Sequence, residues 1–279
     1  MCNTQSNNIT TLNKLFNEPK IMGILNVTPD SFYSGSRFTE EKSILTQVDK
    51  MLSEGMDIID IGGMSTRPGC QAITKDEEFD RVVPIVKLIH KYFPNLFISV
   101  DTFRSSVAKG ACEEGCTIIN DISGAIDEHI LDVAKEYSAT YLLMHYYGDE
   151  NGKMASHKYN DIINDMLKYF EEKIKLVESK GVKDIIIDPG LGFSKTMGEN
   201  YKVLYNTDVF KKFNYPVLIG VSRKRMIYQI LGSTPEESLN GTSILNTIAL
   251  LKGADILRVH DVKEAVEAKK IISFLNKNI

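Results

Sequence analysis

The sequence predicts an α/β protein folded as a single (β/α)8 TIM barrel, on three observations. Short runs of β-branched and other apolar residues alternate with amphipathic stretches along nearly the whole chain. The runs are apolar throughout, as in Ile185–Ile187 and Val217–Ile219, which is typical of parallel strands buried on both faces. Eight such runs in 279 residues give about 35 residues per repeat, the usual period of a β/α barrel.

The eight predicted strands cover Ile21–Asn26, Asp57–Ile61, Phe97–Asp101, Thr117–Asn120, Thr140–His145, Asp184–Asp188, Pro216–Val221 and Asp255–His260. The helical patterns between and after them cover Glu41–Ser53, Lys75–Tyr92, Arg104–Glu113, Asp127–Tyr137, Asp161–Ser179, Glu199–Lys212, Pro235–Lys252 and Val262–Asn276. Thr74 and Glu77 have the spacing of a capping box, and Pro235 is expected to open its helix. Three helix ends are marked by glycines, at Gly55, Gly115 and Gly181.

A doubly wound open sheet is the competing fold. It usually has fewer strands and a glycine-rich phosphate turn after the first one, whereas here Asn26 is followed by Val27–Phe32 without a G-x-G-x-x-G motif. No linker or low-complexity segment divides the chain. We therefore expect one barrel over residues 19–279, preceded by a short polar segment at residues 1–18.

Composition excludes several other classes of protein. Hydrophobic residues make up 43% and charged residues 25%, as in a globular chain that buries a sizeable core, which excludes disordered and fibrous chains. The net charge of −4 argues against non-specific nucleic-acid binding, which needs clustered Lys and Arg. No stretch approaches the roughly 18 apolar residues of a membrane span, and the N-terminus lacks the pattern of a signal peptide. We expect a cytoplasmic protein with neither a nucleic-acid nor a membrane partner.

Polar side chains end all eight predicted strands, where barrels of this kind form their active sites. They are Asn26, Asp60, Asp101, Asn120–Asp121, His145, Asp188, Ser222–Lys224, and Arg258 with His260. Any one of them has a structural explanation, as a hydrogen-bonding group of the fold. Together, against apolar strand bodies, they imply a polar ligand bound at the top of the barrel.

The charged residues among them suggest what that ligand is. Asp101 and Asp188 are expected to face the barrel interior, where a carboxylate needs a hydrogen-bond donor. A heterocycle with adjacent N–H and amino groups offers two donors, and Asn120 both donates and accepts. Lys224 either faces a ring carbonyl or nitrogen, or forms an internal ion pair with an aspartate, and spacing alone leaves both open.

A second group of residues suggests an anion site. Arg258 and His260 are two residues apart and so face the same side of their strand, and with Asn26 they would bind phosphate oxygens. Magnesium held partly by substrate and water is compatible with such a site. The alternative for His260 is a bond to Asp261. The glycine-rich stretch at residues 62–69 suits a lid that closes over a ligand, or else an exposed turn with a solvated arginine.

Seven sequence blocks, in this order, resemble the dihydropteroate synthase family. They are Ile24–Phe32, Gly62–Gly69, Ser99–Thr102, Ile119–Asp121, Asp188–Phe193, Ser222–Lys224 and Arg258–Asp261. Each block alone is modest evidence, but the ordered set is very specific and spans most of the chain. The resemblance implies a homodimeric transferase of folate biosynthesis that condenses (7,8-dihydropterin-6-yl)methyl diphosphate with 4-aminobenzoate, releasing pyrophosphate.

The resemblance also implies roles for individual residues. It implies that the pterin is held by Asp101, Asn120, Asp188 and Lys224, with its pocket lined by Met144 and Phe193. It places the diphosphate on Asn26, Arg258 and His260, with Mg²⁺ at Asn26. It frames the 4-aminobenzoate, with which sulfonamide drugs compete in this family, by Thr66, Arg67, Pro68 and Ser222. The residues expected to carry the catalysis are Asp101, Asp188, Lys224 and Arg258.

The expected chemistry is a dissociative substitution, because an aniline nitrogen is a poor nucleophile. The dihydropterin delocalises a cation at its exocyclic carbon, and nearby carboxylates stabilise that charge. The chain departs from the family pattern at two positions, Ser34 and Met64, where an acidic residue is usual. We expect these changes to slow the ordering of the loops at residues 26–36 and 62–69 but not to abolish activity.

Three other functions fit parts of the pattern. A methyltetrahydrofolate–corrinoid methyltransferase binds the same ring but needs neither the Thr66–Pro68 stretch nor the anion site. A catalytically silent pterin-binding protein is left open by Ser34 and Met64. A Schiff-base aldolase would use Lys224, with its pKa depressed by the neighbouring arginines.

Overall fold

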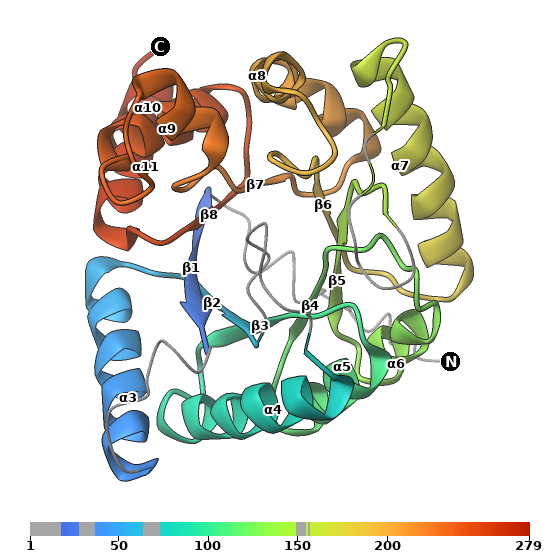
Figure 1. The fold of residues 1–279 in the computed structure, drawn as a ribbon, viewed down its shortest axis with the longest axis vertical. Coiled ribbons are helices and arrows are strands. Elements are labelled where there is room, and N and C mark those ends of the chain that lie inside the picture. The colour runs from blue at the N-terminus through green and yellow to red at the C-terminus, as the bar shows by residue number, and fades with distance from the viewer. Residues whose placement is uncertain (1–17, 28–36, 64–72, 149–154, 156) are drawn as a thin grey trace, which may run out of the picture.

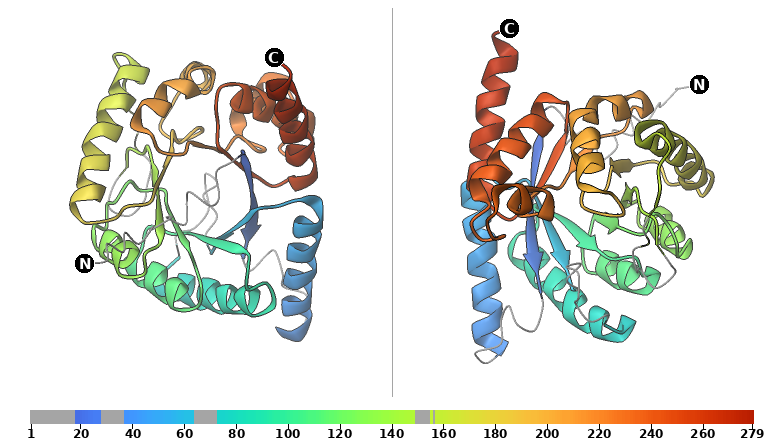
Figure 2. Two further views of the ribbon diagram at one scale, coloured as in Figure 1. Left: turned by 180° about the vertical axis from the view of Figure 1, so that it is seen from behind. Right: turned by 45° about the horizontal axis from the view of Figure 1, so that its top comes forward.

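Eight parallel strands close into a barrel with the helices around its outside (Figures 1 and 2). The computed structural model describes residues 18–27, 37–63, 73–148, 155 and 157–279. Hydrogen-bonded neighbours follow the order β6-β5-β4-β3-β2-β1-β8-β7, and a parallel bridge between Ile187 and Val217 joins β6 to β7. The predicted (β/α)8 barrel is confirmed.

The strands are β1 (Lys20–Asn26), β2 (Ile58–Gly62), β3 (Phe97–Asp101), β4 (Ile118–Asp121), β5 (Thr140–Met144), β6 (Ile185–Asp188), β7 (Leu218–Ile219) and β8 (Ile256–Val259). The helices are α3 (Arg37–Glu54), α4 (Lys75–Tyr92), α5 (Ser105–Glu113), α6 (His129–Glu136), α7 (Ile162–Ser179), α8 (Met197–Tyr205), the 3₁₀ helix η1 (Thr207–Phe213), α9 (Arg225–Leu231), α10 (Leu239–Leu251) and α11 (Val262–Lys277). None of the described helices is both long and apolar enough to cross a membrane.

The start of α4 and three helix ends follow the sequence signals. The Thr74 hydroxyl accepts from the Glu77 N–H at 3.2 Å, and the Glu77 carboxylate accepts from the Thr74 N–H at 2.8 Å, so the capping box is confirmed. The glycines predicted after helix ends have left-handed backbones, with φ of +103°, +111° and +89° at Gly55, Gly115 and Gly181.

The region between β7 and β8 differs from the prediction. Pro235 does not open a helix. It begins a single turn capped by Thr234 and Glu237, and this turn ends before α10 starts at Leu239. A separate helix, α9, precedes it and ends at Gly232, where φ is +61°. The predicted helix at residues 199–212 is interrupted at Asn206, which separates α8 from η1.

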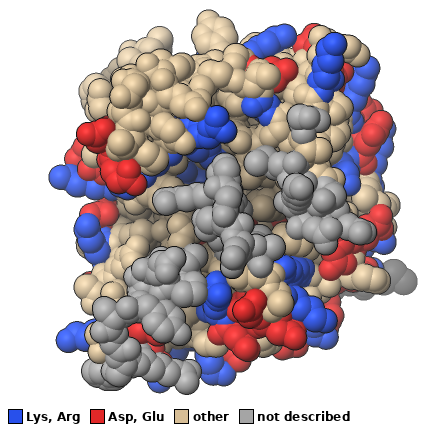
Figure 3. Space-filling model, in the orientation of Figure 1, with Lys and Arg blue, Asp and Glu red and all other residues tan. Residues whose placement is uncertain are grey.

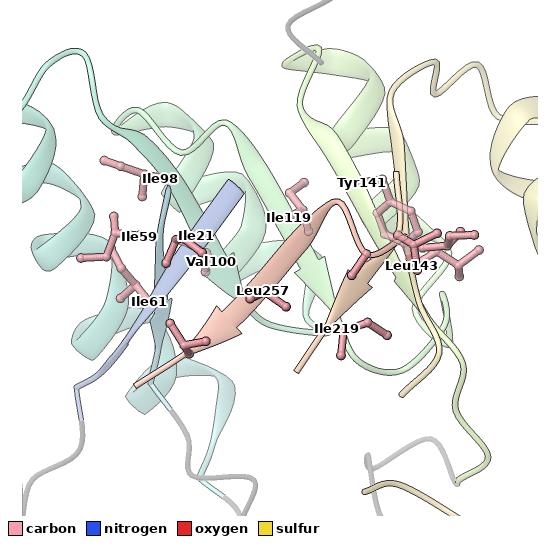
Figure 4. Packing of buried hydrophobic residues seen from close by; sticks show 14 of the residues in the cluster. Ile21, Ile59, Ile61, Ile98, Val100, Ile119, Tyr141, Leu143, Ile219 and Leu257 are labelled. Atoms are coloured by element: carbon pink, nitrogen blue, oxygen red, sulfur yellow. The ribbon is translucent and has the colours of Figure 1, made fainter. Parts of the chain in front are cut away.

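Strand alternation separates an inner from an outer set of side chains. The outer set packs against the helices and includes Ile21, Ile59, Ile61, Ile98, Val100, Ile119, Tyr141, Leu143, Ile219 and Leu257 (Figure 4). A smaller apolar cluster takes one residue from each strand: Met22, Ile58, Phe97, Ile118, Leu142, Ile186, Leu218 and Ile256. Both faces of each strand are therefore buried, which is why the runs lack polar alternation.

A layer of polar side chains lies next to the inner apolar cluster, toward the carboxyl end of the barrel. Two residues further along their strands, on the same face, five positions are polar: Asp60, Ser99, Asn120, Asp188 and Arg258. The fold thereby brings polar and charged side chains from β2, β3, β4, β6 and β8 together inside the carboxyl end of the barrel. Residues 1–17 lie outside the described residues, so the separate N-terminal segment stays a prediction.

Candidate active site

A fully buried carboxylate, Asp60 in the middle of β2, joins three other strands of the barrel. Its Oδ1 accepts from the Ser99 hydroxyl on β3 at 2.6 Å, and its two oxygens lie 3.3 and 3.2 Å from the Asn120 amide nitrogen on β4. Its Oδ2 accepts from Arg258 Nε on β8 at 2.7 Å and lies 2.6 Å from Nη2. All these donors come from inward-facing positions of the polar layer.

Arg258 also reaches Asp101, at the end of β3. Its Nη2 donates to Asp101 Oδ2 at 2.9 Å, so one guanidinium lies between two carboxylates. Burial opposes the charge of Arg258, but Asp60 and Asp101 outweigh it and raise its pKa above the ordinary value. Burial raises the pKa of Asp101 to about 7, and the neighbouring carboxylates add to that rise while Arg258 opposes it. The expectation that Asp101 needs a donor partner is met by Arg258.

Asp188 and Lys224 form the opposite side of the cluster. Asp188, at the end of β6, accepts from the Gly190 N–H at 2.7 Å, and burial raises its pKa against the pull of Lys224. Lys224 forms no ion pair with a described carboxylate. Its Nζ donates to the Leu191 carbonyl and lies 4.7 Å from the centre of the Phe193 ring, and burial lowers its pKa to about 8. The internal ion pair considered for Lys224 is therefore absent from the described residues.

Asn120 and Met144 complete the predicted pterin set. The Asn120 amide nitrogen is engaged by Asp60, so the side chain is fixed in orientation. Met144 is almost fully buried at the end of β5, and its Cγ packs close to Gly190. The structure thus brings the six predicted pterin residues to neighbouring positions at one end of the barrel.

The predicted anion residues lie along the same rim. Asn26 pairs with Gly62 in the sheet register, and Gly62 pairs with Asp101 on the next strand. His260 Nδ1 is 3.0 Å from the Ser222 hydroxyl, which also accepts from the His260 N–H at 3.2 Å.

The alternative partner considered for His260 is engaged elsewhere. The Asp261 carboxylate accepts from Arg223, through Nε and Nη2.

Several predicted positions, namely Thr66, Arg67, Pro68, Ser34 and Met64, lie outside the described residues.

The residues most engaged in the site include three to which the sequence assigned no role. The sequence marks Asp60 only as a polar strand end, and Ser99 shares its inward face with Asp101 two residues later. Lys195 follows β6, and its Nζ contacts two carbonyls and the buried His145 ring. The first two carry a signal in strand alternation, but Lys195 lies in an irregular segment where no periodicity applies.

A magnesium site built by the protein alone is not found among the described residues, which contain no cluster of three His, Cys, Asp or Glu side chains suited to a metal. Asn26 is half-buried, and its amide makes no hydrogen bond with another described side chain. One amide oxygen of this kind fits Mg²⁺ when phosphate oxygens and water supply the remaining ligands.

Comparison with known proteins decides the family. Residues 22–260 match the family described as pterin binding enzyme. Dihydropteroate synthase of Bacillus subtilis is 43% identical over 261 residues, covering 92% of this chain and 89% of that protein. The chain belongs to the dihydropteroate synthase family.

Two solved dihydropteroate synthases have the same fold. The enzyme of Yersinia pestis in complex with a sulfonamide drug is 37% identical, with a TM-score of 0.86 over 93% of this chain and 95% of that one. The enzyme of Xanthomonas albilineans with 4-aminobenzoic acid is 34% identical, with a TM-score of 0.86 over 93% of this chain and 94% of that one. The dihydropteroate synthase barrel is therefore shared along nearly the whole length.

The raised pKa of Asp101 predicts a pH dependence of stability. The folded chain keeps a proton that an unfolded aspartate releases near pH 4. This contribution to the free energy of unfolding is therefore full at low pH and is lost as the pH rises through about 7. Relative to Asp101→Asn, the wild type is expected to lose about 2 kcal/mol between about pH 5 and pH 7, measured by urea unfolding.

The exposed Asp132→Asn variant on α6 serves as the control for this measurement. A difference between wild type and Asp101→Asn that stays constant over the same pH range would show that Asp101 is not protonated in the folded barrel.

Proposed function

We propose that this chain catalyses the reaction for which its family is named, the condensation of (7,8-dihydropterin-6-yl)methyl diphosphate with 4-aminobenzoate. The products are 7,8-dihydropteroate and pyrophosphate, in the synthesis of folate. The observation that carries the proposal is the cluster of Asp101, Asn120, Asp188 and Lys224 inside the mouth of a barrel that belongs to a pterin-binding family.

The pterin ring is proposed to lie among these four side chains. A Gly190 N–H occupies one Asp188 oxygen, which leaves the other for an N–H donor of the heterocycle. Lys224 offers donors to a ring nitrogen or carbonyl, and its position is fixed by the Leu191 carbonyl and the Phe193 ring. The amide nitrogen of Asn120 donates to Asp60, so the amide oxygen of Asn120 is the group proposed to face the ligand.

The diphosphate is proposed to lie toward Arg258, His260 and Asn26. The two carboxylates use Nε and Nη2 of Arg258, so Nη1 is the nitrogen that remains for a phosphate oxygen. Bound Mg²⁺ would neutralise part of the charge of the departing pyrophosphate, with Asn26 as its protein ligand. The 4-aminobenzoate is proposed to lie near Ser222, together with Thr66, Arg67 and Pro68.

The proposed chemistry is a dissociative substitution. The bond between the exocyclic carbon and the diphosphate oxygen breaks first, and both of its electrons leave with pyrophosphate. Asp101 and Asp188 stabilise the resulting dihydropterin cation, while Arg258 stabilises the leaving anion. The amine nitrogen of 4-aminobenzoate then bonds to the carbon and loses one proton.

An exposed apolar surface supports the proposed homodimer. Its exposed residues lie on α9, α10 and α11: Ile230, Leu231, Ile244, Leu251, Ile271 and Phe274. The surface over these helices, at upper left in Figure 3, carries few charges. Monomeric proteins rarely expose apolar patches of this kind, so we propose that a second copy of the chain covers it.

Pyrophosphate release tests the proposed reaction. Sustained release over many turnovers, with formation of 7,8-dihydropteroate, should require both the pterin diphosphate and 4-aminobenzoate. Asp188→Asn should lower kcat/KM by roughly 100-fold, because it removes charge stabilisation from the cation. Asp208→Asn, on the exposed face of η1, should leave kcat/KM unchanged.

Two outcomes would overturn these proposals. Sustained pyrophosphate release at the same rate without 4-aminobenzoate, or an Asp188→Asn variant as active as the wild type, would contradict the assigned reaction and site. A rate that depends strongly on the basicity of substituted 4-aminobenzoates would contradict the dissociative step.

Sedimentation velocity tests the dimer. The wild type is expected to sediment as a dimer at micromolar concentration, and Phe274→Glu, which places a charge on the apolar surface, should sediment as a monomer. Tyr92→Glu, at an exposed aromatic residue on α4, is the control and should remain dimeric. A monomeric wild type, or a dimeric Phe274→Glu variant, would refute the assigned interface.

A further inference from the structure

The ammonium group of Lys195 lies at the centre of the segment that follows β6. Its Nζ donates to the carbonyls of Gly190 and Phe193, at 2.8 and 3.1 Å, and lies 3.1 Å from Nδ1 of His145. An ammonium group has three donors, so these three partners satisfy it completely. The backbone of residues 190–193 therefore binds one side chain, Lys195, and that side chain also contacts His145, which directly follows β5.

His145 completes this arrangement as an acceptor. Its side chain is fully buried, and burial together with the nearby Lys195 charge lowers its pKa to about 2, so the ring is neutral. A neutral imidazole has one acceptor nitrogen, and an ammonium group only donates, which assigns the acceptor to Nδ1. His145 is thus a fixed anchor for Lys195 on a rigid strand end.

The segment held by Lys195 supports the proposed pterin residues. The Gly190 N–H holds Asp188, and the Leu191 carbonyl and the Phe193 ring hold Lys224. A side chain at Gly190 would meet the His145 carbonyl at 2.4 Å, so the backbone packs directly on β5.

Three residues of this segment have a positive φ, and one of them is not a glycine. Gly190, Gly192 and Ser194 all have left-handed conformations, with φ of +65°, +86° and +49°. Glycine adopts a positive φ without strain, whereas Ser194 does so only where surrounding contacts impose it. The Lys195 ammonium supplies two contacts to the backbone that precedes Ser194, at the carbonyls of Gly190 and Phe193.

We propose that Lys195 is a positioning residue for the pterin pocket, whose ammonium group sets the positions of Asp188 and Lys224 through the 190–193 segment. The inference rests on the proposed function, because it assigns those two residues to pterin binding. Lys195 itself contacts neither the ring nor the reacting atoms.

The cost of a buried cation argues against a packing role alone. Burial lowers the pKa of Lys195 to about 7, with Lys224 adding to the decrease and Asp188 and Glu199 opposing it. A methionine fills a similar volume without that desolvation penalty. The lysine is therefore explained by its three hydrogen bonds and not by its volume.

Lys195→Met tests the inference, with Lys202→Met as its control on the exposed face of α8. Lys195→Met is expected to raise the Kd of (7,8-dihydropterin-6-yl)methyl diphosphate, measured by calorimetry without 4-aminobenzoate, by tenfold or more. Its KM for 4-aminobenzoate should stay within twofold of the wild type, and Lys202→Met should match the wild type in both quantities.

The results separate a positioning role from a merely structural one. A structural role lowers the melting temperature but leaves the pterin Kd of the folded protein unchanged, and that result would overturn the inference. A wild type that binds no pterin diphosphate would instead overturn the proposed function itself.

A measurement on the wild type needs no variant to fold. In protein labelled with ¹⁵N-histidine, pterin diphosphate is expected to shift the ring-nitrogen resonances of His145. The ligand contacts Asp188 and Lys224, and the 190–193 segment links both of them to the Lys195 ammonium that donates to His145. 4-Aminobenzoate alone should leave the His145 resonances in place. Unshifted His145 resonances at saturating pterin diphosphate would overturn the inference.

Discussion

The site depends on one carboxylate, Asp60, that is fully buried and so shielded from bulk solvent. Such a group is stable only with donors around it, and the barrel supplies them from β3, β4 and β8. The consequence is that Arg258 is fixed between Asp60 and Asp101, with one nitrogen left for an anion, and that Asn120 is fixed with its amide nitrogen inward. The proposed pterin and diphosphate sites are therefore arranged before any ligand arrives, which is the condition for electrostatic catalysis.

Much of the fold could be predicted because its signals are local. Continuous apolar runs predicted buried parallel strands, and the strand ends predicted the residues of the polar layer. The exceptions have local causes too. Around Pro235 the capping residues that usually begin a helix begin only one turn, because Ser238 leaves the helical conformation before α10 starts. A pattern of capping residues indicates where a helix can start but not how far it continues.

The sequence predicted which residues form the site better than it predicted which of them contact one another. Polarity at the strand ends found Asp101, Asp188 and Arg258, but which carboxylate pairs with which cation depends on the stagger of strands far apart in sequence. Lys224 thus binds a carbonyl and a ring instead of an aspartate. Lys195 could not be found at all, because its partners are carbonyls of an irregular segment and a ring that directly follows β5. Tertiary geometry of this kind leaves no periodic trace in a sequence.

A double-mutant cycle on Asp60→Ala and Arg258→Ala tests this account most directly. Asp60→Ala leaves Arg258 with Asp101 as its remaining partner, and Arg258→Ala leaves both carboxylates without their shared cation. Each single variant should lose about 3–5 kcal/mol of unfolding free energy, measured by urea denaturation. The double variant should lose at least about 2 kcal/mol less than the sum of the two, because it removes both charges together. Single losses that add to within about 0.5 kcal/mol would show that the two side chains are independent, and the arrangement of the site could not then depend on their pairing.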